Sequence, residues 1–378
     1  MSQNKFILLF LLAAALLLVF LLTFNIRKKS DTDLKRQIGQ MLIVGFRGCE
    51  VSENSYIIKA VRNLNLGGIV LFDMDGPTKS FPRNIQSPRQ LKELIRDLQK
   101  SAPVPLFISL DAEGGRVNRL KPKYGFIAVP GHQELGEKND VRETHHVSAQ
   151  LARELAGLGF NLDFAPSVDV NANPYNPVIG ALGRSFSADE KVVLAQAKAF
   201  IAGLHEQGVL TAIKHFPGHG SSNADSHKGF VDVTDTYQDR ELLPFKELIK
   251  DGVVDMVMTA HIMNKKIDAD YPATLSGRFI NNILRKELGF KGVVVSDDMQ
   301  MGAITQRYGF KEALIRAVNA GCDMLIVSNN GSVYNEKAPY EAVAIIAAAV
   351  KSGEIPMQRI MDSNQRIETL KKALKNGR

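Results

Sequence analysis

Apolar and polar positions along the chain form two kinds of block. Short runs of consecutive apolar residues, many of them β-branched, are typical of strands that are buried on both faces. Longer stretches place apolar residues three and four apart, which is typical of helices with one buried face. The short runs predict eight strands, at residues 40–46, 67–72, 104–111, 159–166, 208–215, 254–261, 292–298 and 322–328.

The stretches with helical spacing lie mostly between these runs. Strands that alternate with helices are typical of a parallel sheet covered by helices. The helical spacing predicts helices at residues 87–101, 143–158, 187–207, 239–251, 276–288, 311–320, 339–351 and 356–375.

Eight strands alternating with helices over roughly 320 residues favour one TIM-like (β/α)8 barrel. The alternative is an open, doubly wound sheet. No GxGxxG follows the first strand and no GxxxxGK occurs anywhere, so the usual nucleotide-binding forms of that alternative lack their motifs. No linker rich in Pro, Gly or Ser divides the chain, and we expect a single catalytic domain over residues 31–378.

Residues 1–30 differ from the rest of the chain. Residues 6–26 contain no charged side chain. A helix of this length reaches about 30 Å, which is the thickness of the hydrocarbon core of a bilayer. We expect an N-terminal transmembrane helix that anchors the barrel, because no small-x-small cleavage site follows it; a cleaved signal peptide is the alternative.

Charge and cysteine content narrow the classes of function. The formal net charge is +7, and residues 27–29 and 371–378 carry seven of the positive charges, so the rest of the chain is close to balanced. No basic stripe with interleaved aromatic residues is present, and we expect no nucleic-acid partner. Cys49 and Cys322 have no metal-ligand spacing, and they fall near opposite ends of the predicted barrel, so we expect no disulfide.

Polar residues end five of the eight predicted strands. In a barrel the carboxyl ends of the strands and the loops after them form the catalytic face. An acid or base at such an end therefore favours an active site over a structural ion pair. The residues concerned are Asp111, Lys214, His215, His261, Asp297, Asp298, Ser328 and Asn329.

The loop after the fifth strand, "KHFPGHGSSNADSH", carries three histidines among glycines. Asp225 and His227 are two residues apart and point to one side of an extended segment. The carboxylate can then accept from one ring nitrogen and leave the other to exchange protons near neutral pH. A capped turn with a solvated histidine is the alternative interpretation of this pair.

The same loop allows a metal site as a second hypothesis. His215, His219, His227 and Asp225 are residue types that bind zinc. However, Phe-Pro-Gly separates the first two histidines and prevents the helical spacing of an HExxH site. A metal-dependent barrel hydrolase therefore remains the weaker interpretation.

Four motifs in this order resemble glycoside hydrolase family 3, and the closest resemblance is to its β-N-acetylhexosaminidases that act on peptidoglycan fragments. The resemblance covers roughly residues 34–350. The motifs are "DAEGGRVNR" (111–119), "GRSF" (183–186), "KHFPGHG" with "DSH" (214–227) and "VVSDDMQMGAI" (294–304).

The resemblance implies a retaining enzyme on a TIM-like barrel, without a metal or organic cofactor. It implies that Asp297 is the nucleophile and that His227, assisted by Asp225, is the acid/base. The implied substrate-binding residues are Asp111, Arg119, Arg184, Lys214 and His215.

Some motif positions carry weaker implications. Glu113 and Arg116 can simply hold the turn of the third-strand motif, and Asp298 has a supporting role or none. Ala112 stands where the family usually has Gln, and we expect it to point away from the mouth. Asn118 also stands where Gln is common.

The resemblance implies a substrate that contains N-acetylglucosamine, and we expect a monomer. The remaining alternative is a non-catalytic, membrane-tethered saccharide-binding protein. An anchor near cell-wall glycan favours a catalytic domain on the extracytoplasmic side of a bacterial cytoplasmic membrane. Arg27, Lys28 and Lys29 argue for the cytoplasmic side instead, and secretion after signal cleavage is a further alternative.

Overall fold

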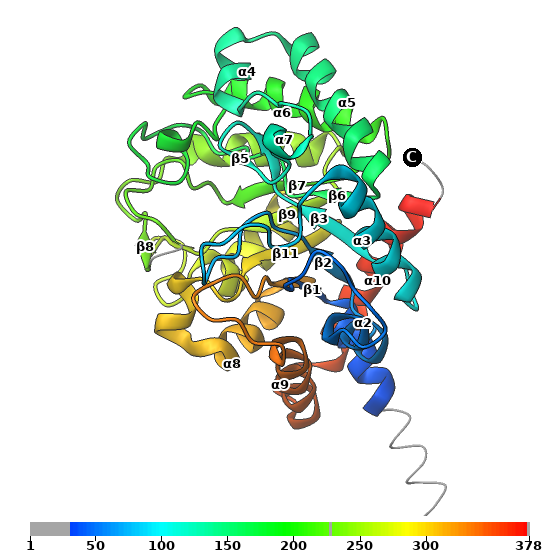
Figure 1. Ribbon diagram of the computed structural model, residues 1–378. Helices are drawn as coiled ribbons and strands as arrows, with labels where there is room; N and C mark the ends of the chain where they lie inside the picture. Colours follow the sequence, from blue (N-terminus) through cyan, green and yellow to red (C-terminus); the bar gives the residue numbers. More distant parts are fainter. Residues whose placement is uncertain (1–30, 227–228, 376–378) are drawn as a thin grey trace, which may run out of the picture.

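The computed structural model describes residues 31–226 and 229–375 of the chain. Eight parallel strands form a closed barrel at the centre of the molecule, with helices around it (Figure 1), so the predicted TIM-like barrel is confirmed. The last strand pairs with the first, and residues 42–44 lie in register with residues 325–327. In order around the barrel the strands are β1 (Leu42–Val44), β2 (Gly68–Val70), β3 (Phe107–Leu110), β6 (Leu162–Asp163), β7 (Leu210–Phe216), β9 (Met256–Thr259), β11 (Val293–Asp298) and β12 (Met324–Val327).

All eight predicted strands are present, but most hydrogen-bonded ladders are shorter than the apolar runs. The run at residues 159–166 contains only the two-residue strand β6. Phe164 and Ala165 in the same run are 2% and 0% exposed, yet they lie beyond the ladder. Burial therefore continues past backbone pairing at the mouth of the barrel, and an apolar run overestimates the length of the strand.

The helices cover the outside of the barrel. Most of them match the predicted ranges within a few residues, whereas α2, α4 and the helix at residues 31–40 were not predicted. After the helix at residues 31–40, the helices are α2 (Tyr56–Leu64), α3 (Pro88–Ser101), α4 (His132–Lys138), α5 (Val141–Leu158), α6 (Glu190–His205), α7 (Leu243–Lys250), η5 (Arg278–Glu287), α8 (Gly302–Ala320), α9 (Ala338–Ser352) and α10 (Met357–Lys375).

Helix α3 illustrates how the sequence determines such a helix. Ser87 precedes it, and the Ser87 hydroxyl accepts a hydrogen bond from the Gln90 amide at 3.3 Å. Pro88 occupies the first helical position, where a missing N–H costs nothing. The buried residues 91, 94, 95 and 98 follow the helical period and face the barrel.

Helix α8 is longer than its predicted range of 311–320. It begins at Gly302, directly after the strand that carries Asp297, and it is interrupted at Gly309, where φ is 69° and ψ is 162°. This left-handed φ favours glycine. Ala303 and Ile304 before this break are buried, but the predicted range of 311–320 did not extend across the glycine.

Two small sheets lie in the loops at the mouth of the barrel. Strands β4 (Ala112–Gly114) and β5 (Val117–Asn118) form an antiparallel hairpin after β3. Strands β8 (Val231–Asp232) and β10 (Ile262–Met263) pair in parallel after β7 and β9. Gly114 has a φ of 86°, and a Cβ there would lie 2.1 Å from the Pro130 carbonyl oxygen, so the hairpin requires glycine.

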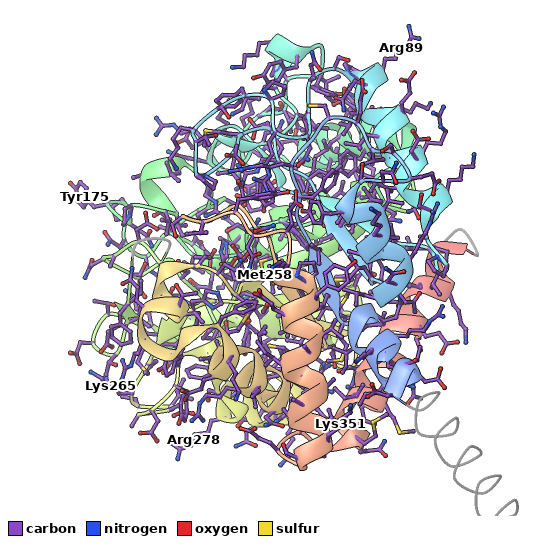
Figure 2. The ribbon with its side chains drawn as sticks, turned by 60° about the horizontal axis from the view of Figure 1, so that its bottom comes forward. Arg89, Tyr175, Met258, Lys265, Arg278 and Lys351 are labelled. Atoms are coloured by element: carbon purple, nitrogen blue, oxygen red, sulfur yellow. The ribbon has the colours of Figure 1, made fainter. Side chains whose placement is uncertain are left out.

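The interior and the surface agree with the apolar pattern. Figure 2 shows Met258, a residue of β9, among the side chains in the middle of the molecule, whereas Tyr175 projects outward and is 88% exposed. Cys49 and Cys322 are both free thiols, so the expectation of no disulfide is confirmed.

No helix within residues 31–226 and 229–375 has the length and apolar character to cross a membrane. The predicted transmembrane helix at residues 6–26 lies outside the described residues.

Candidate active site

A cavity of about 970 Å³ opens at the carboxyl ends of the barrel strands. Ligand sites commonly have volumes of about 300–1,000 Å³, so a sugar ring and part of its leaving group fit. His227 lies outside the described residues, but the seven other predicted site residues all line this cavity. They are Asp111, Arg119, Arg184, Lys214, His215, Asp225 and Asp297.

Lys214 lies at the centre of an ion-pair network. It belongs to β7, its side chain is 1% exposed, and its Nζ lies 2.8 Å from Asp111 Oδ1 and 2.6 Å from Glu113 Oε1. Burial opposes the charge of Lys214, but the two carboxylates outweigh it and raise the pKa of the ammonium. Lys214 is therefore a fixed cation at the base of the cavity.

Glu113 has a larger role than holding the turn of its motif. It is 1% exposed and receives two hydrogen bonds from Arg184, at 2.8 Å and 2.7 Å. Burial opposes ionisation, but Arg184 and Lys214 outweigh it and hold the pKa of Glu113 below its usual value. Glu113 lies between Arg184 and Lys214, but it belongs to the hairpin after β3. A search for polar residues at strand ends therefore does not find it.

Asp111 and Arg119 present more of their polar atoms to the cavity. Arg119 donates to Asp111 Oδ2 at 3.0 Å, and the two side chains are 30% and 18% exposed. The Arg119 guanidinium also lies over the ring of Phe72, 5.5 Å from its centroid. Burial raises the pKa of Asp111, but Lys214 and Arg119 outweigh it, so the pKa lies below its usual value and the carboxylate is an acceptor.

His215 is held by an aspartate that the sequence reasoning missed. Its Nδ1 lies 2.6 Å from Asp169 Oδ2, and Asp169 is fully buried. On the other side of the ring, Nε2 lies 3.1 Å from an amino group of Arg184. Asp169 lies in the loop after β6, which ends at Asp163, so a rule that looks for acids and bases at strand ends does not reach it.

Asp297 and Asp298 end strand β11, as predicted. The Asp298 amide donates to Asp297 Oδ1 at 2.7 Å, which orients the Asp297 carboxylate. Asp298 itself accepts from the Ser328 hydroxyl at 2.5 Å and from the Ser328 amide at 3.1 Å. Burial, with a contribution from Asp297, raises the pKa of Asp298 to about 6. Asp298 therefore faces strand β12 and supports its neighbour.

Two residues of the motif after the third strand differ from the residues that are usual in the family, and the structure shows where both lie. Ala112 is fully buried and does not line the cavity, as expected. Asn118 is 6% exposed and its Oδ1 accepts from the Leu120 amide at 2.9 Å. Both positions therefore shape the hairpin and make no contact with the cavity.

The described histidines of the loop after β7 do not converge on a metal site. His215 is engaged by Asp169 and Arg184, and the side chain of His219 by two serines. The guanidinium beside His215 occupies the position that a cation would need. Within residues 31–226 and 229–375 no group of three or more His, Cys, Asp or Glu side chains has the geometry to hold a metal ion.

A second cavity, of about 510 Å³, lies at the other end of the barrel. Its lining includes residues 254–255 before strand β9, residues 291–292 before β11, the first residue of β11, and residues of α10. It contains none of the predicted site residues. The strand-end cavity is therefore the candidate active site.

The network at the strand ends is balanced in charge. The carboxylates of Asp111, Glu113 and Asp169 face the cations of Arg119, Arg184 and Lys214. A neutral, hydroxyl-rich ligand suits such a surface, because it can both donate to carboxylates and accept from cations. Asp297 and Asp225 line the same cavity.

Comparison with known proteins identifies relatives of the whole barrel. Residues 33–370 match the family described as "Glycosyl hydrolase family 3 N terminal domain". The chain is 35% identical over 345 residues to "Beta-hexosaminidase A" of Pseudoalteromonas piscicida, covering 83% of this chain and 54% of that protein. It is also 35% identical over 294 residues to "Beta-hexosaminidase" of Tolumonas auensis, covering 76% of this chain and 83% of that protein.

Solved structures agree with these matches. A glycoside hydrolase family 3 β-N-acetylglucosaminidase from Paenibacillus sp. str. FPU-7 superposes with a TM-score of 0.82 at 38% identity. The superposition covers 90% of this chain and 62% of the Paenibacillus chain. This chain therefore spans about half to two thirds of the length of some relatives and most of others. The family resemblance drawn from the motifs is confirmed.

Proposed function

Because this chain belongs to glycoside hydrolase family 3, we propose that it is a glycoside hydrolase, and specifically a retaining β-N-acetylhexosaminidase. The substrate would be a peptidoglycan fragment or related oligosaccharide with a terminal β-linked N-acetylglucosamine. Asp297 would act as the nucleophile, and His227, assisted by Asp225, as the acid/base. Asp111, Arg119, Arg184, Lys214 and His215 would hold the sugar.

The reaction proceeds in two displacements. In the first, an Asp297 oxygen attacks the anomeric carbon, the glycosidic C–O bond breaks, and His227 gives its proton to the departing oxygen. In the second, water attacks the same carbon, His227 takes a proton from that water, and the ester to Asp297 breaks. Each step inverts the anomeric centre, so the product keeps the β configuration.

One observation carries the proposal. Asp297 at the end of β11 and Asp225 in the loop after β7 line one cavity together with all five proposed sugar-binding side chains. The carboxylate of Asp297 is oriented by the adjacent amide, as a nucleophile requires. Asp298 is a poorer candidate, since its carboxylate is occupied by Ser328.

A trapped intermediate tests the assignment. A fluorinated glycosyl donor slows the second displacement, and mass spectrometry of the digested protein should then locate the sugar on the Asp297 peptide at that residue. A sugar on Asp298 would reverse the assignment. Release of an α-configured first product in an NMR time course would refute the two-step mechanism.

The two alternative functions give different results. A saccharide-binding protein without catalysis would show the same behaviour after Asp297→Ala, whereas the enzyme should lose hydrolysis of an aryl β-N-acetylglucosaminide. A metal-dependent hydrolase would lose activity after thorough chelation, whereas the proposed mechanism should keep it.

We also propose that residues 6–26 attach the enzyme to a membrane and that the barrel faces the extracytoplasmic side. The support is their uncharged apolar sequence. A reporter enzyme fused after residue 378 should be active only on the extracytoplasmic side, and activity only in the cytoplasm would refute the orientation. The expected monomeric state also stays a prediction.

A further inference from the structure

His219 is the one histidine of the described part of the "KHFPGHGSSNADSH" loop that has no role in the proposed reaction. It is 3% exposed and does not line the cavity. Its Nδ1 lies 2.7 Å from the Ser222 hydroxyl, and its Nε2 lies 3.3 Å from the Ser226 hydroxyl. The ring therefore bridges the beginning of the loop and the residue directly after Asp225.

A neutral imidazole is suited to this bridge. A neutral ring has one donor nitrogen and one acceptor nitrogen. A serine hydroxyl can either donate or accept, so the ring forms a hydrogen bond with each serine in either tautomer. Burial lowers the pKa of His219 to about 4, which keeps the ring neutral near pH 7.

The first end of the bridge is fixed to the barrel. The His219 amide donates to Asp169 Oδ1 at 2.7 Å, and Asn176 donates to the Ser222 hydroxyl at 3.0 Å. At Gly220 a Cβ would lie 1.7 Å from the Val170 carbonyl oxygen, so the loop packs directly on the chain after β6. His219 thus projects from a rigid base.

The second end holds the segment that carries Asp225. The Ser226 carbonyl accepts from the Ala303 amide at 3.2 Å, in the first turn of α8. Helix α8 follows the strand that carries Asp297. Ser226 is therefore held on two sides. His219 links it to β7, whose following loop carries the proposed acid/base, and α8 links it to β11, which carries the proposed nucleophile.

We propose that His219 is a positioning residue, which fixes Ser226 and thereby sets the place of the Asp225 carboxylate in the cavity. The inference rests on the proposed function, in which Asp225 assists the acid/base His227. His219 touches no reacting atom in this account. Its loss should weaken proton donation to the leaving group and leave attack by Asp297 largely intact.

Leaving-group dependence separates this role from a general structural one. Dinitrophenyl β-N-acetylglucosaminide needs little protonation of its leaving oxygen, whereas phenyl β-N-acetylglucosaminide needs much more. In His219→Asn the shorter amide can reach the Ser222 side only. We expect kcat/KM to fall by about 10-fold or more with the phenyl substrate and by less than about 3-fold with the dinitrophenyl substrate.

Matched variants sharpen the test. His219→Gln places a polar atom near the Nε2 position and should retain more phenyl hydrolysis than His219→Asn. Ser226→Ala removes the receiving hydroxyl and should reproduce the effect of His219→Asn. His205→Asn is the control: His205 Nε2 lies 2.7 Å from Asp255 Oδ2 near the other end of the barrel, and its loss should affect both substrates equally.

The outcomes distinguish the inference from the proposed function. If His227→Ala shows the leaving-group dependence and His219→Asn does not, the positioning role is refuted and the acid/base assignment stands. If His227→Ala shows no such dependence, the acid/base assignment is refuted and the positioning role falls with it. Rates with the dinitrophenyl substrate report how much of each variant is folded, so misfolding cannot imitate the expected result.

Discussion

Arg184 donates a hydrogen bond to Nε2 of His215 across 3.1 Å. A guanidinium has donors only, so Nε2 must accept, and the ring proton lies on Nδ1, where it is donated to Asp169 at 2.6 Å. His215 is therefore held as one tautomer, with its ring proton on Nδ1. A ring with both nitrogens engaged in this way suits sugar binding and leaves proton transfer to another group.

We predict that Arg184→Lys lowers kcat/KM by about 10- to 100-fold, mainly through a higher KM. Arg184 donates to Glu113 twice, to the Val178 carbonyl at 2.9 Å and to His215. One ammonium cannot make these contacts together, so His215 would lose its fixed orientation. Steady-state kinetics on an aryl β-N-acetylglucosaminide measure the effect.

The control for this prediction is Arg116→Lys. Arg116 is exposed, comes from the same hairpin region as Glu113, and donates to the Ala181 carbonyl at 2.9 Å. It should change kcat/KM by less than about 2-fold, since one surface hydrogen bond contributes little. Equal losses in the two variants would contradict the special role of Arg184.

Lys214→Met should destabilise the fold by about 3–5 kcal/mol at pH 7, because it leaves two buried carboxylates without their shared cation. The pKa values of Asp111 and Glu113 are held low against burial by neighbouring cations, Lys214 among them. Without Lys214 both pKa values rise, so the folded variant can take up protons more readily than the wild type. Its deficit should therefore shrink between pH 7 and pH 5.

Chemical denaturation of wild type and variant at both pH values tests this expectation. Lys92→Met changes an exposed lysine of α3 and should alter the free energy of unfolding by less than about 0.5 kcal/mol at either pH. A Lys214→Met deficit that is the same at pH 5 and pH 7 would argue against the carboxylates as its cause.

The barrel could be predicted from sequence because each buried strand is a continuous apolar run. Part of the candidate site was predicted because acids and bases interrupt such runs at their ends, as at Asp111 and Asp297, whereas Arg119 and Arg184 were predicted from the family resemblance alone. Asp169 was missed because it lies in the loop beyond the end of β6, and Glu113 was undervalued. Their importance arises from partners 46 and 71 residues away, His215 and Arg184, and sequence separation of that size carries no local signal.

Other features depend on tertiary contacts in the same way. The first part of α8 is short and is separated from the rest of the helix by the break at Gly309, and its Ala303 amide binds the Ser226 carbonyl. Helix α2 was also missed, because its nine residues form a short pattern next to a loop. The apolar pattern therefore predicts the eight strands and most of the helices, and the bounds of α8 depend on contacts that form only in the fold.

Asp163 should make the fold less stable as pH rises. It is fully buried on β6, its Oδ1 accepts from the Ala112 amide at 2.9 Å, and burial raises its pKa to about 8. The unfolded chain ionises this carboxyl near pH 4 while the folded chain keeps its proton. The contribution of Asp163 to stability is therefore full below about pH 4 and decreases until about pH 8.

Asp163→Asn removes this titration and keeps the acceptor for Ala112. We expect the free energy of unfolding of wild type, minus that of the variant, to decrease by about 3–5 kcal/mol between pH 4 and pH 8. Asp140→Asn is the control, because Asp140 caps α5 at the surface and accepts from the Arg142 amide. A difference for Asp163→Asn that does not change with pH would show that this carboxyl titrates in its usual range.

Lys371 should give the opposite pH dependence at the far end of the barrel. It lies on α10, is 5% exposed, and its Nζ lies 2.9 Å from Gln40 Oε1 and 5.0 Å from the centroid of the Phe107 ring. Burial lowers the pKa of Lys371 to about 7. As pH falls from about 10 to about 7, the unfolded chain gains a proton at this amine and the folded chain does not. The contribution of Lys371 to stability therefore decreases as pH falls through that range, and it is constant at lower pH.

Lys371→Met should therefore be more stable than wild type at pH 7 by about 2–4 kcal/mol, and the advantage should shrink at pH 9.5. Methionine has a similar length and fills the same apolar space over Phe107. The control is the neighbouring Lys372→Met, since the Lys372 side chain is 68% exposed and pairs with Glu368 at 2.8 Å. Urea denaturation at the two pH values gives the difference, and a Lys371→Met variant less stable than wild type at pH 7 would mean that the buried amine stabilises the base of the barrel.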